Sequence, residues 1–97
     1  MSIQVLDFYA DWCGPCKTQA PIFDDVKEEF EDNDTVTFEK VDVEEDQKRA
    51  NMFNVRSIPT IVIIEVDDED EEVTLLEQFV GITEANDLEE AVNEQLE

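Results

Sequence analysis

The sequence predicts an α/β fold in which helices cover both faces of one central, mixed, four-stranded sheet. Short apolar runs alternate with segments whose apolar residues recur every three or four positions, in the order strand, helix, strand, helix, strand, strand, helix. The length of 97 residues fits one small hydrophobic core, and no repeat or linker divides the chain. We therefore expect residues 1–97 to form a single domain.

The first half of the chain is predicted to form a parallel β-α-β unit. Ile3–Tyr9 is a buried strand, because apolar residues occupy both of its faces. Apolar residues at helical spacing then predict an amphipathic helix over residues 13–31. Val36–Val43 is the second strand, which a right-handed crossover places parallel to the first.

The second half adds a short helix, a hairpin and a last helix. Asp46–Phe53 is predicted to be helical, while the apolar Ile58–Ile64 and Val73–Val80 are the two hairpin strands. Residues 65–72 contain seven acids in eight positions and no glycine, which predicts a solvated loop rather than a specific cation site.

The last helix is predicted from an apolar stripe that includes Ala85, Leu88 and Leu96. Thr83 or Asn86 is the expected N-cap, because short polar side chains can accept hydrogen bonds from the first free backbone N–H groups.

The charge of the chain excludes several function classes. Six Lys and Arg face 28 Asp and Glu, for a net charge of −22, so binding to nucleic acid or to an anionic membrane surface is not expected. No apolar run approaches the roughly 18 residues of a membrane span, and the start lacks the basic and apolar regions of a secretion signal, so we expect a cytoplasmic protein. Because the acids are spread along nearly the whole chain, we favour a halophilic protein over a nucleic-acid mimic or an acidic interaction module.

A halophilic protein should be stabilised by salt. Potassium chloride shortens the range of repulsion between like charges, so the midpoint of urea unfolding should rise from low to molar KCl. A midpoint that stays constant or falls would contradict the halophilic interpretation.

Two cysteines carry the chemistry that the sequence predicts. With no His and only two Cys, one chain cannot complete a four-ligand zinc site or a disulfide scaffold. In Cys13-Gly14-Pro15-Cys16, Cys13 stands at a helix start, where free N–H groups should lower its pKa from about 8.5 toward about 7. Cys16, one turn later, is close enough to form an internal disulfide. Zinc shared between two chains, a purely structural disulfide and two inert thiols are the less favoured alternatives.

The segment from Asp7 to Lys17 resembles the active-site segment of the thioredoxin family. The resemblance continues over almost the whole chain, in residues 20–22, 40–43, 55–60 and 79–81. It implies a minimal thioredoxin fold that lacks the customary first strand and helix, with Val36–Val43 at one sheet edge. It also implies a reductase of protein disulfides that is recycled by a thioredoxin reductase, and we expect no cofactor and no metal.

The resemblance implies a role for each matching residue. Cys13 would be the attacking thiolate and Cys16 the buried resolving thiol of a Cys13–Cys16 redox disulfide. Asp7 would accept the proton of Cys16, with Lys40 as its partner, although a solvent-exposed Asp7 and a solvated Lys40 are alternatives. Pro59 would be a cis proline that faces the disulfide.

The resemblance also implies an apolar surface on which substrate polypeptides dock. Its residues would be Trp12, Gly14, Pro15, Ile58, Pro59, Val80, Gly81 and Ile82. Trp12 could instead fill the core, but its position directly before Cys13 favours an exposed lid.

Other functions and assemblies remain as alternatives. A glutaredoxin-like, glutathione-dependent reductase is disfavoured by Gly-Pro between the cysteines and by the scarcity of cations that would hold glutathione carboxylates. A non-enzymatic binding module is the third function class. We expect a monomer, with a homodimer through the exposed edge strand as the alternative.

Overall fold

The computed structural model describes all 97 residues, and its elements follow the predicted order. The strands and helices are β1 (Ser2–Tyr9), α1 (Gly14–Glu29), β2 (Val36–Asp42), α2 (Gln47–Met52), β3 (Thr60–Val66), β4 (Val73–Val80) and α3 (Ala85–Leu96).

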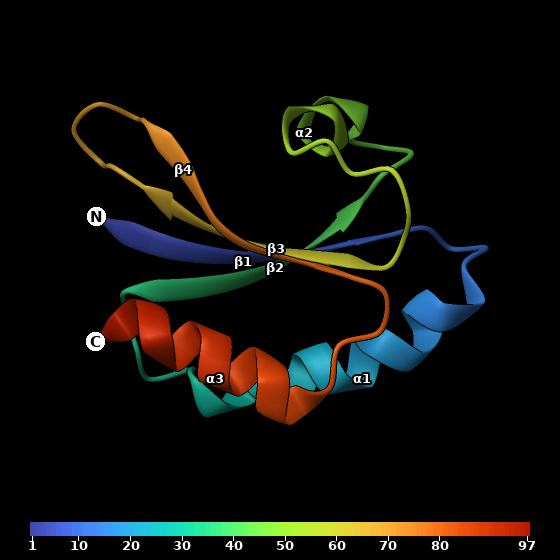
Figure 1. Cartoon of the computed structure of the whole chain (residues 1–97), viewed down its shortest axis with the longest axis horizontal. Coiled ribbons are helices and arrows are strands. Elements are labelled where there is room, and N and C mark those ends of the chain that lie inside the picture. Colours follow the sequence, from blue (N-terminus) through green and yellow to red (C-terminus); the bar gives the residue numbers. More distant parts are fainter.

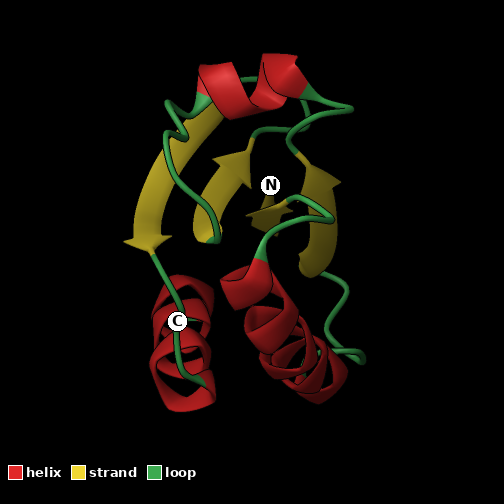
Figure 2. Cartoon of the chain, turned by 90° about the vertical axis from the view of Figure 1, so that its right-hand side faces the viewer, coloured by secondary structure: helices red, strands yellow, loops and turns green.

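One sheet with the strand order β2-β1-β3-β4 forms the centre of the molecule. β1 pairs in parallel with β2 and antiparallel with β3, and β3 pairs antiparallel with β4. Helices α1 and α3 lie on one face of this sheet, and α2 covers part of the other face (Figures 1 and 2). The predicted fold class is therefore confirmed, with β2 at one edge.

The alternation of β1 side chains builds a core on each face of the sheet. Val5 points into the larger cluster, where it meets Phe23 of α1 and Leu88 of α3. Leu6 points into the smaller cluster on the opposite face, which contains Phe53 at the end of α2. Each such side chain contributes roughly 1.5–3 kcal/mol on burial, and the two clusters together fix both helical layers on the central strand.

Several predicted boundaries differ from the structure by one or two residues, including the start of β3 and the end of α1. β3 begins at Thr60 rather than Ile58, since Pro59 has no backbone N–H with which to join the ladder. Helix α1 ends at Glu29, two residues before the predicted end.

The predicted cap of the last helix is wrong. Neither Thr83 nor Asn86 caps α3, and Glu84 occupies the N-cap without a side-chain hydrogen bond. Thr83 is instead buried against Gln19 of α1: its N–H donates to Gln19 Oε1 at 2.7 Å, and its carbonyl accepts from Gln19 Nε2 at 3.0 Å. Gln19 is fully buried, so its amide can be satisfied only by partners within the protein, and Thr83 supplies both of them. The N-terminus of α3 is exposed and has less need of a side-chain cap.

Residues 67–72 of the acidic segment form the turn between β3 and β4, whereas Glu65 and Val66, predicted to lie in the loop, pair with β4 as the last residues of β3. The one ion pair of the acidic segment joins the Met1 amine to Asp68 at 2.8 Å, and both groups are well exposed. No group of three or more His, Cys, Asp or Glu side chains is arranged to hold a metal ion. None of the helices combines the length and the apolar character that a bilayer crossing requires.

Candidate functional site

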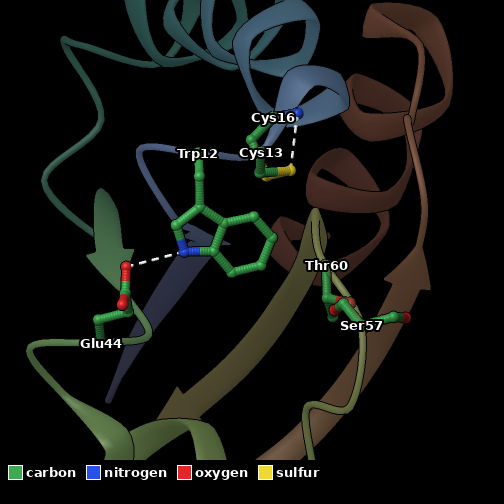
Figure 3. The surroundings of a disulfide bond; sticks show 6 residues. All are labelled: Trp12, Cys13, Cys16, Glu44, Ser57 and Thr60. Carbon is green, nitrogen blue, oxygen red and sulfur yellow. Dashed lines mark hydrogen bonds between the residues drawn. A yellow bond between two sulfur atoms is a disulfide. The ribbon is translucent and has the colours of Figure 1, made fainter.

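The two cysteines form a disulfide at the N-terminus of α1. Cys13 is the N-cap residue, Cys16 lies in the first turn, and their Cα atoms are 5.3 Å apart. The backbone N–H of Cys16 donates to Cys13 Sγ at 3.2 Å (Figure 3). A thiolate at Cys13 would be stabilised by the same N–H and by the positive end of the helix. The expected Cys13–Cys16 pair is thus present in the geometry that disulfide exchange requires.

The residues between the cysteines explain why the helix begins here. Pro15 occupies the first turn, where a backbone N–H would have no partner within the helix and where its fixed φ suits the helical conformation. A side chain at Gly14 would meet no atom within 4 Å, so the surface beside the disulfide is open at this position. The Cys13 residue itself exposes 4% of its surface and Cys16 exposes 5%, so a substrate must approach from this open side.

The loop before β3 forms the opposite side of the site. The Ile58–Pro59 peptide bond is cis, as the resemblance implied, and Ile58 packs against the small cluster that contains both cysteines. The carbonyl of Pro59 accepts a hydrogen bond of 2.8 Å from the N–H of Gly81. Gly81 adopts a φ of +93°, a conformation that favours glycine. This bond joins the end of β4 to the loop beside the disulfide.

The structure therefore brings together most residues of the predicted docking surface. Val80 and Ile82 flank Gly81 and are exposed, whereas Ile58 is half-buried and Pro59 is buried. Trp12 exposes 70% of its surface, which excludes the alternative that it fills the core. An apolar surface that surrounds a nearly buried disulfide is suited to contact with a polypeptide chain.

Trp12 is held in place by a residue that sequence reasoning missed. Its indole N–H donates to Glu44 Oε1 at 2.9 Å, across 32 positions of sequence (Figure 3). A shallow pocket of about 370 Å³ lies between Trp12, Ile58 and the loop residue Arg56. Glu44 is one of 28 acids in the chain, so no signal in the sequence singles it out.

Asp7 lies on β1 in a pocket of about 290 Å³ that Cys16 and Lys40 also line. Only 2% of Asp7 is exposed, which excludes the alternative of a solvated carboxylate, and its Oδ1 atom accepts no hydrogen bond. Burial raises the pKa of Asp7 to about 7, while the positive charge of Lys40 opposes this rise. A carboxyl group with such a pKa can accept and release a proton near neutral pH.

Lys40 is placed beside Asp7 but forms its ion pair elsewhere. The two residues are register partners in the parallel pairing of β1 with β2. The Lys40 Nζ atom nevertheless lies 2.9 Å and 3.1 Å from the two carboxylate oxygens of Asp24, on α1. Lys40 therefore acts on Asp7 through space, and the direct pair that its assignment as the Asp7 partner suggests is absent.

Comparison with known proteins decides the family. The family model described as Thioredoxin matches residues 1–94. The chain belongs to the thioredoxin family. Within this family, a Cys-X-X-Cys pair that forms a disulfide at a helix N-terminus makes the protein a thiol–disulfide oxidoreductase.

Individual relatives of the thioredoxin family match most of the chain. Thioredoxin of Bacillus subtilis is 37% identical over 94 residues, which are 97% of this chain and 83% of that protein. Thioredoxin of Borreliella burgdorferi is 43% identical over 63 residues, but this match spans 65% of this chain and only 52% of that protein. Among solved structures, a mutant thioredoxin from Halobacterium salinarum NRC-1 superposes with a TM-score of 0.76 at 32% identity, covering 99% of this chain and 76% of that chain.

Proposed function

We propose that this protein reduces disulfides of other proteins in the cytoplasm, with Cys13 as the nucleophile and Cys16 as the resolving thiol. The observation that carries this assignment is the hydrogen bond from the Cys16 N–H to Cys13 Sγ, because it favours the thiolate on Cys13. Cys16 lies in the first turn of the helix, within bonding distance of Cys13.

The reaction consists of two exchanges. The Cys13 thiolate attacks one sulfur of the substrate disulfide, forms a mixed disulfide and releases the other sulfur as a thiolate, which takes up a proton. Cys16 then loses its proton and attacks Cys13 Sγ, which forms the Cys13–Cys16 disulfide and releases the second substrate thiolate. Two electrons pass to the substrate, which becomes a dithiol.

Asp7 is the proposed acceptor of the Cys16 proton. The two residues line the same pocket, and the pKa of Asp7, raised by burial to about 7, suits a base that works near neutral pH. Lys40, which lines this pocket as well, would lower the proton affinity of Asp7 through its charge.

Substrates are proposed to dock as extended segments beside Ile58 and Pro59. Backbone pairing there is a form of strand addition, and apolar side chains would contact Trp12, Val80 and Ile82. Gly14, Pro15 and Gly81 would leave room for the substrate backbone. Because the chain carries a charge of −22, docking of basic substrates should weaken as salt rises.

Thioredoxin reductase is the proposed electron donor, and a donor assay tests this assignment. Reduction of insulin should proceed with NADPH and a thioredoxin reductase, but not with glutathione and glutathione reductase. Arg56 is the one cation among the residues that line the pocket beside Trp12, so this pocket offers a single positive charge for the two carboxylates of glutathione. Faster turnover with the glutathione system would instead support a glutaredoxin-like enzyme.

A further inference from the structure

Lys40, one of the residues that line the pocket behind Cys16, has two carboxylates within its reach: Asp7, its register partner on β1, and Asp24 on α1. Asp7 and Lys40 both line this pocket, and Asp24 of α1 holds the Lys40 ammonium group with both carboxylate oxygens. The two partners of this pair are accessible, since the Lys40 side chain is 37% exposed and the Asp24 side chain is 56% exposed. Asp7 is buried and its Oδ1 atom has no hydrogen-bond partner. The Lys40 ammonium group thus pairs with the outer carboxylate and leaves the inner one unpaired.

The pairing of Lys40 with Asp24 rather than with Asp7 affects the basicity of Asp7. An ammonium group in contact with Asp7 would favour the ionised carboxylate and make it a weaker base. A Lys40 that is held by Asp24 acts on Asp7 only from a distance, and the negative charge of Asp24 partly cancels its field. Both effects leave Asp7 more ready to take up a proton.

We propose that Asp24 is a positioning residue of the active site: by holding the Lys40 ammonium group, it keeps Asp7 free of an ion pair and able to accept the proton of Cys16. Asp24 touches neither cysteine in this scheme and acts only through Lys40 and Asp7. The inference rests on the base role proposed for Asp7, but the effect of Asp24 on the titration of Asp7 can be tested without any assay of catalysis.

The titratable groups around Asp7 come from three parts of the fold. β2 contributes Lys40, and α1 contributes Cys16, Lys17 and Asp24, whereas Ile61, the register partner on β3, is apolar. Tyr9 and Asp11 come from the same stretch of chain as Asp7 and line the same pocket. Of these groups, Lys40 and Asp24 dominate the charge effects on the pKa of Asp7, with opposite signs.

The test is a titration of the Asp7 carboxyl carbon by NMR in the reduced protein. In Asp24→Asn the negative charge is lost and Lys40 is free to pair with Asp7, so the titration midpoint of Asp7 should fall by about 1 pH unit. Asp24→Glu keeps a carboxylate for Lys40 and should restore a midpoint close to that of the parent protein. Asp25→Asn is the matched control, because Asp25 is exposed, adjacent and not in an ion pair, and it should leave the midpoint unchanged.

Lys40→Gln provides a second variant that does not depend on the first. Removal of the cation should raise the midpoint of Asp7, and Asp24→Asn should have a smaller effect in this background than in the parent. If Asp24→Asn or Lys40→Gln titrates like the parent protein, Asp24 forms only a surface ion pair and the proposal is overturned.

The pH profile of mixed-disulfide resolution separates this proposal from the base role of Asp7. A shift of the profile together with the Asp7 midpoint in Asp24→Asn would support both. If the Asp7 midpoint shifts in Asp24→Asn but the pH profile does not change, the Asp24–Lys40 pair does control the pKa of Asp7. This result would overturn the part of the proposal in which Asp24 affects proton transfer from Cys16.

Discussion

Cys13→Ser should lose the reduction of protein disulfides, by a factor on the order of a thousand or more, down to the rate without enzyme. A serine hydroxyl cannot exchange with a disulfide, so the helix N-terminus has no thiolate to stabilise. The measurement is the rate of insulin reduction with dithiothreitol or thioredoxin reductase as the donor.

Cys16→Ser is the matched control for this loss. It retains the nucleophile and should react once with each substrate disulfide, but it should fail to turn over because no internal thiol releases the product. Full biological activity of Cys13→Ser would contradict the enzymatic assignment and favour a binding module built on the same fold.

Asp7→Asn should remove a large pH-dependent cost to stability. The pKa of Asp7 rises from 3.8 in a free carboxyl to about 7 in the folded protein, because burial disfavours the charge. Between these two pH values the folded state binds more protons at this position than the unfolded state, so folded stability falls as pH rises. At about 1.36 kcal/mol per pH unit, the full cost above pH 7 is about 4 kcal/mol.

The measurement is urea unfolding of the parent and Asp7→Asn from pH 4 to pH 8. The many other carboxyl groups titrate in both proteins, so the difference between the two curves isolates Asp7. The free energy of unfolding of Asp7→Asn, relative to that of the parent, should rise steadily up to about pH 7 and then become constant. A difference independent of pH would contradict the raised pKa of Asp7.

The fold could be predicted from the sequence because the hydrophobic pattern and the helix-start residues agree with the tertiary arrangement. β1 is apolar on both faces, which matches a central strand with a core on each side. Pro15 and Cys13 at a helix start predicted where α1 begins. The cap of α3 was mispredicted because Thr83 satisfies Gln19, a partner 64 positions away that no local pattern reveals.

The site was predicted to the extent that its chemistry is local. The two cysteines lie within one helical turn, so their spacing predicted their pairing. The ion pair of Lys40 with Asp24 joins a strand to a helix, and the bond from Trp12 to Glu44 joins two loops. In a chain with 28 acids, only the fold determines which carboxylate each of these donors meets.

The central claim is that Cys13, and not Cys16, forms the mixed disulfide with substrate. The most direct test is to incubate the reduced Cys16→Ser and Cys13→Ser variants with a disulfide-bonded protein and to map the adducts by mass spectrometry. We predict abundant adducts on Cys13 in Cys16→Ser and few adducts on Cys16 in Cys13→Ser, because Cys13 is the residue whose sulfur caps the helix and accepts a backbone N–H hydrogen bond that would stabilise a thiolate. Equal trapping on both cysteines, or none on Cys13, would contradict the account.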